Sequence, residues 1–344
     1  MAGKVGTKSS GKEKKEMRRL VSVVLGAFLL FVATGLESRT EGAEKYPAKP
    51  INFIIAVEAG ADGDVICRPL LQKASATLGQ PLVVVNKPGA GSSLGYREIH
   101  DAKPDGYTIG WASATIITNK LQGISPYDYH DFTQLGTFAT YFPIIVASTK
   151  TQRPFKTIQE VISFAKANPG QLSMATAGVG QSWWVAAMSF IEGTGLKINT
   201  IPQPGAGAYT VTQVAGGHTD VGVVALGSAK SMLEAGNVRF LATLGSKRAP
   251  APYDKFPTVK ELGYDVSWES TNLLMGPPKL PRDIADILTK AFEKAANDPE
   301  FVKFVLERNA NHTYLSPDKV VPFLDERRQV VRRIMDKAGV LKEK

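Results

Sequence analysis

The sequence predicts an α/β fold of two domains, the first of them discontinuous. After the first 45 residues, short β-branched runs alternate with longer amphipathic segments. This alternation is typical of parallel sheets with helices on their faces. Two stretches, 131–151 and 242–257, lack helical periodicity and are the expected points where the chain changes domain. Two crossings give a first domain of residues 44–143 and 247–344 and a second domain of residues 144–246.

Each expected strand is a short apolar run, and each expected helix is a longer amphipathic run. The expected strands are 51–57, 82–85, 107–112, 144–147, 172–176, 220–224 and 240–244. The expected helices are 65–78, 158–168, 183–193, 209–216, 281–297 and 317–338. The helix over 158–168 has the clearest end, because Pro169 and Gly170 directly follow its periodic run.

Residues 1–43 have the pattern of a secretory signal. A run of 14 mostly apolar residues, 20–33, follows a basic stretch and precedes small and then polar residues. A membrane span needs about 20 apolar residues, so this run is short for one, and an uncleaved anchor is the alternative. We expect cleavage between about residues 35 and 43 and export of the remaining chain.

The charge of the chain gives little support to a nucleic-acid-binding function. Residues 1–43 hold 8 Lys/Arg and 4 Asp/Glu, so they supply +4 of the formal net charge of +9 and leave +5 to the rest. The remaining cations are dispersed among acids, except at 327–328 and 332–333. Helical spacing makes these two pairs a solvated helix face, and we expect no nucleic-acid partner.

The reactive side chains do not form an enzyme motif. Cys67 is the only cysteine, so no internal disulfide forms, and its place on a helix pattern favours a buried thiol over a nucleophile. The four histidines are scattered, whereas a metal site needs three or four converging ligands. The sequence also lacks G-x-x-x-x-G-K-[ST], H-E-x-x-H and G-x-S-x-G. We therefore expect no metal, no cofactor and no enzyme.

Two glycine-rich loops each precede an expected helix. The first, 58–64, follows the apolar run 51–57, and the second contains Gly178 and Gly180. The first backbone N–H groups of a helix are unpaired and carry partial positive charge, so a loop of this kind is ready to bind an anion. Ser182 is the expected N-cap of the second helix.

Polar side chains also follow the third expected strand. Ser113 and Thr115 lie just beyond the run 107–112. The carboxyl ends of strands in open α/β sheets form the crevice where ligands bind. Their hydroxyls could therefore bond a carboxylate or cap the next turn, and the sequence leaves both roles open.

An ordered series of motifs carries a family resemblance along nearly the whole exported chain. The first part comprises Tyr46-Pro47-x-Lys49-Pro50-Ile51, the Gly60–Asp64 loop, Leu78-Gly79-Gln80-Pro81-Leu82-Val83-Val84-Val85-Asn86-Lys87-Pro88-Gly89-Ala90-Gly91 and Pro104-Asp105-Gly106-Tyr107-Thr108. The second part comprises Pro126-Tyr127-Asp128-x-x-x-Asp131-Phe132, Ala165-Lys166-Ala167-Asn168-Pro169-Gly170, Gly178-x-Gly180, Gly216-Gly217-His218-x-Asp220 and Pro257-Thr258-x-x-Glu261-Leu262-Gly263. In this order the motifs resemble the substrate-binding receptors of tripartite tricarboxylate transporters, the Bug family.

The resemblance implies a two-lobed periplasmic solute-binding protein of type II architecture. Such a receptor closes over a small carboxylate-bearing organic acid and presents it to the large and small membrane subunits of a transporter. A receptor for a membrane sensor, or an enzyme acting on a small carboxylate, is the alternative. We expect a monomer. The implied ligand-binding residues are Glu58, Ala59, Gly60, Ala61, Asp62, Gly63 and Asp64 in the first loop and Gly178, Val179, Gly180, Gln181 and Ser182 in the second.

This chain departs from the family pattern in both loops. Glu58 and Asp62 add negative charge to the first loop and are either solvated loop carboxylates or acids that contact the ligand. If they face the cleft, they favour a ligand with an amine, hydroxyl or aromatic portion over citrate. Asp64 matches the family's aspartate and is expected to cap the following helix. Trp183 begins a Trp-Trp pair that replaces a common histidine, and it either packs in the core or forms an aromatic wall of the ligand pocket. Gly205 lies in a replaced segment that could supply backbone donors.

Overall fold

The computed structural model describes Gly3, residues 46–204 and residues 207–343. Apart from Gly3, the expected signal region lies outside these residues, as does Gly205. Of the helices that are described, none has the length and apolar character required to cross a membrane. The segments 46–204 and 207–343 belong to one compact unit.

The first sheet has six strands, in the order β11-β4-β10-β3-β1-β2. Its strands are β1 (Ile51–Ile55), β2 (Leu82–Asn86), β3 (Thr108–Ser113), β4 (Thr133–Tyr141), β10 (Ser270–Gly276) and β11 (Ala310–His312). β1 pairs in parallel with β2 and β3, whereas β10 runs antiparallel to β3 and β4, and β11 runs antiparallel to β4. The all-parallel sheet expected from the sequence is therefore wrong for the half that contains β4, β10 and β11.

The second sheet has five strands, in the order β7-β6-β8-β5-β9. Its strands are β5 (Pro143–Ser148), β6 (Ser173–Thr176), β7 (Asn199–Pro202), β8 (Val221–Ala225) and β9 (Val238–Thr243). β6 is parallel to β7 and β8, and β5 is antiparallel to β8 and β9. Every residue of β5 and β8 is buried, as expected for strands that are covered on both faces.

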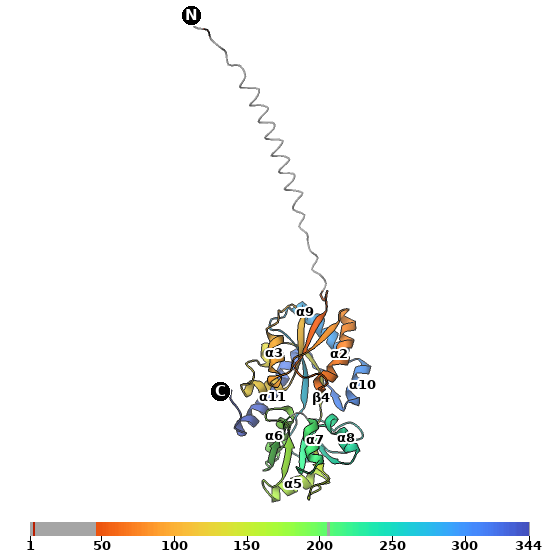
Figure 1. Ribbon diagram of the computed structural model, residues 1–344, viewed down its shortest axis with the longest axis vertical. Helices are drawn as coiled ribbons and strands as arrows, with labels where there is room; N and C mark the ends of the chain where they lie inside the picture. Colours follow the sequence, from red (N-terminus) through yellow and green to blue (C-terminus); the bar gives the residue numbers. More distant parts are fainter. Residues whose placement is uncertain (1–2, 4–45, 205–206, 344) are drawn as a thin grey trace. The chain divides into compact units, whose positions relative to one another are not determined.

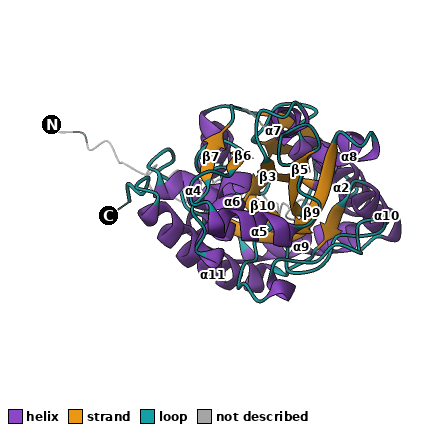
Figure 2. Ribbon diagram, turned by 90° about the horizontal axis from the view of Figure 1, so that it is seen from below, coloured by secondary structure: helices purple, strands orange, loops and turns teal. Residues whose placement is uncertain are grey.

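Helices cover both sheets (Figures 1 and 2). Those that pack on the six-stranded sheet are α2 (Asp62–Leu78), α3 (Ser93–His100), α4 (Thr115–Leu121), α9 (Arg282–Ala296), α10 (Pro299–Glu307) and α11 (Pro317–Lys337). Those of the second sheet are α5 (Ile158–Ala167), α6 (Ser182–Thr194), α7 (Gly207–Ala215) and α8 (Leu226–Glu234). We call the six-stranded sheet with its helices the first lobe and the five-stranded sheet with its helices the second lobe.

Local sequence signals set several helix ends. The Thr157 hydroxyl accepts a hydrogen bond from the amide of Glu160 and so caps α5. Asp298 caps α10 in the same way, and Pro299 occupies the first helical position, where its missing N–H costs nothing. Gly79 ends α2 in the left-handed conformation at φ 70°.

The chain passes between the lobes at two places. β4 of the first sheet ends at Tyr141 and β5 of the second sheet begins at Pro143. The chain leaves the second sheet after Thr243 and joins the first sheet again at Ser270. The two-lobed architecture with a discontinuous first part is thereby confirmed. The exact domain boundaries, 143/144 and 246/247, stay predictions.

All seven expected strands are present, but β4, β7, β10 and β11 were missed. β4 and β10 lack the apolar pattern of a buried strand because they carry buried polar residues. Asn272 on β10 is 1% exposed, accepts a hydrogen bond from Trp111 Nε1 at 2.9 Å and donates one to the Ala139 carbonyl at 3.0 Å. Partners far along the chain satisfy these groups, and such partners leave no periodic signal.

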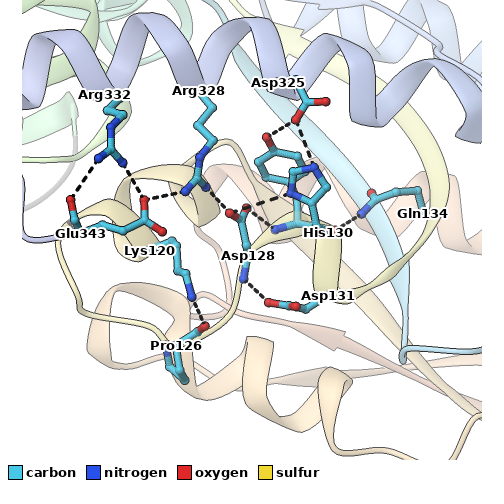
Figure 3. Close-up of polar contacts among 11 residues, drawn as sticks. Lys120, Pro126, Asp128, His130, Asp131, Gln134, Asp325, Arg328, Arg332 and Glu343 are labelled. Carbon is cyan, nitrogen blue, oxygen red and sulfur yellow. Dashed lines mark hydrogen bonds and ion pairs between the residues drawn. The ribbon is translucent and has the colours of Figure 1, made fainter.

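The expected solvated face at 327–328 and 332–333 is wrong in part. Figure 3 shows Arg328 and Arg332 of α11 pointing toward acidic partners. Arg328 pairs with Asp128 and, at 2.6 Å, with Glu343, which also accepts from Arg332 at 3.0 Å. The side chain of Arg328 is only 21% exposed. These two cations are therefore neutralised within the first lobe, where they attach the C-terminal segment to α11.

Candidate functional site

The first glycine-rich loop is held by the carboxylate of Asp64. This side chain is 3% exposed and forms an ion pair with Arg68 at 2.8 Å. It also accepts hydrogen bonds from the Gly60 amide at 2.9 Å and from Asn86 Nδ2 at 2.9 Å. Burial alone would raise the pKa of Asp64, but its donors, led by Arg68, together hold it below the ordinary value. Asp64 thus fixes the shape of the loop.

The expected role of Asp64 as the helix N-cap is wrong. Helix α2 begins at Asp62, three residues earlier than expected, and its N-cap is Ala61, whose side chain cannot cap. Asp64 is therefore the third helical residue, and its carboxylate reaches back to the loop. The amides of Asp62 and Gly63 donate no hydrogen bond to another described residue, because they lie in the first turn.

Gly63 has a packing role in this loop. It is buried, and a Cβ atom there would lie 2.6 Å from Cζ2 of Trp111. Only a glycine lets the start of α2 approach the indole so closely. Ala59 and Glu58 are exposed, and Glu58 therefore remains a solvent-accessible acid of the loop.

The second glycine-rich loop lacks a side-chain cap. Helix α6 begins at Ser182, and its N-cap is Gln181, which makes no side-chain cap hydrogen bond, so the expected Ser182 cap is wrong. Gly180 has φ +83°, and a Cβ atom there would lie 2.0 Å from Oε1 of Gln122, the residue that ends α4 in the first lobe. Val179 is exposed at 42%, and Gly178 is half-buried. The loop thus rests on the opposite lobe.

The two loops approach the same segment of the chain. The Ser182 hydroxyl lies 3.1 Å from the hydroxyl of Ser270, the first residue of β10. Ser270 is the register partner of Tyr141 in the first sheet. The hydroxyl of Tyr141 donates to the Asp62 carbonyl at 2.8 Å. One loop from each lobe therefore meets the point where β4 and β10 pair at the crossing between the lobes.

The end of β3 joins the same region. Ser113 is the register partner of Asn272, two residues along β10 from Ser270. The hydroxyls of Ser113 and Thr115 lie 2.6 Å apart, and that of Thr115 lies 3.2 Å from the Tyr96 hydroxyl. These contacts use part of the capacity of both hydroxyls, each of which can accept and donate.

Trp183 and Trp184, adjacent on α6, differ in burial. Trp184 is 3% exposed and belongs to the core, whereas Trp183 is half-buried and packs against it. Adjacent helical residues point about 100° apart, so only one of the two indoles can face fully inward. Whether Trp183 forms a wall of the ligand pocket stays a prediction.

A cavity of about 380 Å³ lies beside the first loop and is lined by both lobes. Its lining residues are Gly60, Asp62, Val65, Ile66, Tyr141, Ala225, Gly227, Lys230, Glu307, Arg308 and Asn309. Although the Asp62 residue is exposed, nearby protein atoms displace water from its carboxyl and raise its pKa. Burial likewise raises the pKa of Tyr141 well above its usual range.

Of the eleven residues that line this cavity, the sequence predicted only Gly60 and Asp62 as ligand-binding residues. Tyr141, Lys230 and Arg308 come from segments far apart in the chain and belong to no motif. Asn309 adopts φ +56°, a left-handed conformation that asparagine tolerates better than most residues, and it directly precedes β11. Tyr141 is the last residue of β4, and Arg308 directly follows α10, whereas Lys230 lies within α8, where no local pattern distinguishes it from other exposed residues.

Comparison with known proteins gives consistent matches over most of the chain. The family model described as the tripartite tricarboxylate transporter family receptor matches residues 66–340. A UPF0065 protein in the gbd 5′ region of Cupriavidus necator is 30% identical over 304 residues, which cover 87% of this chain and 90% of the relative.

Solved structures share the fold. A TctC solute-binding protein from Polaromonas, solved without ligand, is 25% identical, has a TM-score of 0.74, and is matched over 85% of this chain and 99% of its own. R. palustris Rpa4515 has the same fold at a TM-score of 0.74 and 23% identity, over 86% of this chain and 99% of its own.

Proposed function

Because the chain belongs to the tripartite tricarboxylate transporter receptor family, also called the Bug family, we propose that it captures a small carboxylate-bearing organic acid between its two lobes. It then delivers the acid to the membrane subunits of a tripartite transporter. The observation that carries this proposal is the meeting of the two glycine-rich loops and the end of β3 at the start of β10.

The chemistry of the loops suits a carboxylate. The first amides of α2 and α6 point out of helix N-termini that carry partial positive charge. One helix terminus contributes about 0.3–1 kcal/mol, whereas micromolar binding needs about −8 kcal/mol. Several donors must therefore act together, and the loops of both lobes are required at once. A ligand that contacts both lobes favours their closed arrangement.

The family also supports a location and a set of partners. The similar structures include a TctC solute-binding protein and the periplasmic binding protein BugD, and a periplasmic location agrees with the secretory pattern of residues 1–43. The R. palustris structure with the same fold contains adipate, a small dicarboxylate. We propose that the mature chain acts in the periplasm, as a monomer, and meets a large and a small membrane subunit.

A thermal-shift screen of the mature chain against small carboxylic acids tests the proposal. A ligand that binds only the folded state adds about 2.7 kcal/mol of stability at 100 times its Kd, so an authentic ligand raises the melting temperature measurably. Calorimetry then gives the affinity and stoichiometry. Absence of any shift across a broad acid library counts against the proposal, and chemical turnover of a binding acid would point to an enzyme instead. Loss of acid uptake in a deletion strain separates transport from sensing.

A further inference from the structure

The last carbonyl groups of α4 find hydrogen-bond donors in two ways. Those of residues 118–120 accept from amides that follow closely in the chain. The Leu121 carbonyl instead accepts from the amides of Lys342 at 2.9 Å and Glu343 at 3.1 Å. Carbonyl groups at a helix C-terminus have no partner within the helix, so such donors stabilise its end. The segment 340–343, which lies beyond α11, therefore supplies the support that the sequence around α4 does not.

Glu343 fixes the segment 340–343 to α11 (Figure 3). Its carboxylate accepts from Arg328 at 2.6 Å and from Arg332 at 3.0 Å, and its backbone carbonyl accepts from Arg332 at 3.3 Å. Arg328 also pairs with Asp128, and the Glu343 side chain is 24% exposed. Charged groups that form a network partly shielded from water hold one another more firmly than an isolated surface pair does. The Glu343 side chain thus keeps its own amide in place beside α4.

This support orients Gln122, the residue that ends α4. The Leu121 carbonyl and the Gln122 amide belong to one planar peptide unit, which ends at the Cα atom of Gln122. The segment 340–343 holds the carbonyl of this unit, and the Thr118 carbonyl accepts from its amide at 2.9 Å. Because both polar groups of the unit are engaged, the direction in which the Gln122 side chain leaves the helix is fixed.

The Gln122 carboxamide lies against the second glycine-rich loop. A Cβ atom at Gly180 would lie 2.6 Å from its Cδ and 2.9 Å from its Nε2, so only a glycine fits there. The loop has no side-chain cap, and its turn is closed by the Gln181 amide, which donates to the Gly178 carbonyl at 3.0 Å. Gln122 therefore supports the turn from the first lobe.

We propose that Glu343 is a positioning residue of the ligand site. It acts through the Leu121 carbonyl, which keeps Gln122 against Gly180 and so holds the second loop in the shape that binds the acid. The inference rests on the proposed function, which assigns that loop to the carboxylate. A contact between the lobes stabilises the arrangement in which it forms, so loss of this contact lowers the population that is ready to bind.

Hydrogen exchange of single amides in the ligand-free mature chain, followed by NMR spectroscopy, tests the proposal without a known ligand. The Gln122 amide reports on the end of α4, and the Gln181 amide reports on the second loop. The Ala61 amide is the matched reference in the first loop, because it donates to the Glu58 carbonyl at 3.2 Å, as Gln181 does to Gly178. Amides exchange when the local structure opens, so faster exchange measures lost support.

Two variants and one control define the route. Glu343→Ala is expected to speed exchange of the Gln122 and Gln181 amides by about fivefold and to leave Ala61 unchanged. Gln122→Ala removes the carboxamide and should speed exchange at Gln181. If Glu343 acts through Gln122, adding Glu343→Ala to Gln122→Ala produces no further change at Gln181. Glu326→Gln removes an exposed carboxylate of α11 and should change none of the three amides.

Three exchange results overturn the inference. Faster exchange at Gln122 without a change at Gln181 would confine the effect of Glu343 to α4. A further acceleration at Gln181 in the double variant would mean that Glu343 reaches the loop by another route. Equal acceleration of all three amides in Glu343→Ala would mean a general loss of stability.

Binding measurements separate the inference from the proposed function. Each acid that raises the melting temperature in the carboxylic acid screen should bind Glu343→Ala about fivefold more weakly than the wild type, and Glu326→Gln as tightly. Unchanged affinity in Glu343→Ala overturns the inference and leaves a carboxylate receptor. A screen without any thermal shift counts against the proposed function, whereas the exchange results, which need no acid, still decide whether Glu343 supports the loop.

Discussion

The two glycine-rich loops are organised in opposite ways. The first, 58–64, is held from within its own lobe by the buried carboxylate of Asp64. The second, 178–182, has no side-chain cap and contacts the opposite lobe through Gly180 and Ser182. The first loop is therefore supported by contacts within one lobe, whereas the second loop is supported by contacts that depend on how the two lobes are arranged. In a receptor whose lobes close over a ligand, we expect the first loop to keep its shape and the second loop to change its contacts on closure.

The largest effect is expected when the internal support of the first loop is removed. Asp64→Ala leaves Arg68, Asn86 and the Gly60 amide without their acceptor, so we expect the free energy of unfolding to fall by about 2–3 kcal/mol. Urea denaturation measures the loss. Asp318→Ala is the matched control, because Asp318 is also acidic and in a first helical turn but is exposed, and it should change little. Equal losses of stability in Asp64→Ala and Asp318→Ala would show that the buried carboxylate gives the first loop no special support.

The same carboxylate gives the protein a pH dependence. The pKa of Asp64 is lower in the folded state than its ordinary value of 3.8. A lowered folded pKa stabilises the fold above the unfolded pKa, and this stabilisation is lost as the pH falls through the folded value. The stability difference between the wild type and Asp64→Asn should therefore be constant above about pH 5 and shrink below about pH 4. A stability difference that grows on acidification would mean that folding raises the pKa of Asp64 instead of lowering it.

A smaller effect on stability, with a specific effect on binding, is expected in the second loop. Gly180 and Gly170 both have positive φ, but only Gly180 has a neighbour across the lobes. Alanine at either position should cost about 1 kcal/mol of stability through backbone strain. Gly180→Ala should in addition weaken acid binding by about tenfold, because its Cβ displaces Gln122. Calorimetry measures the acid affinity of both variants. If Gly180→Ala binds the acid as tightly as Gly170→Ala does, the second loop does not belong to the binding site.

The smallest effect is expected at an ion-pair cluster that joins the lobes. Glu192 of α6 accepts from Arg333 at 2.8 Å and from Lys337 at 2.6 Å, both on α11. Such partly exposed pairs contribute at most about 1 kcal/mol and are screened by salt. Glu192→Gln should therefore speed ligand release slightly at low salt and not at 0.5 M salt, a concentration of the order that screens surface charges. Glu300→Gln, whose partner Lys73 lies in the same lobe, should leave release unchanged.

The sequence pattern predicted the elements whose positions depend on residues close together in the chain. The parallel strands β1, β2 and β3 and most helices follow apolar runs, caps and glycine ends, and they lie within a few residues of their expected positions. The buried Cys67 was expected from its helical position and is confirmed. The failures include β10, whose buried Asn272 depends on Trp111 and Ala139. They also include the cap expected at Asp64, which bonds to Gly60, Arg68 and Asn86 instead, and the cap expected at Ser182, whose hydroxyl lies against that of Ser270.

The sequence by itself determined the alternating α/β pattern, the two glycine-rich loops and their family resemblance, because turns, caps and hydrophobic periods depend on neighbours within a few residues. Only the tertiary structure decided that Ser270 and Tyr141 bring the loops of the two lobes together, and that Asp62 and Lys230 share a cavity. These residues are separated by long stretches of chain. Their contacts follow from how the two sheets pack and cross, which no local pattern records.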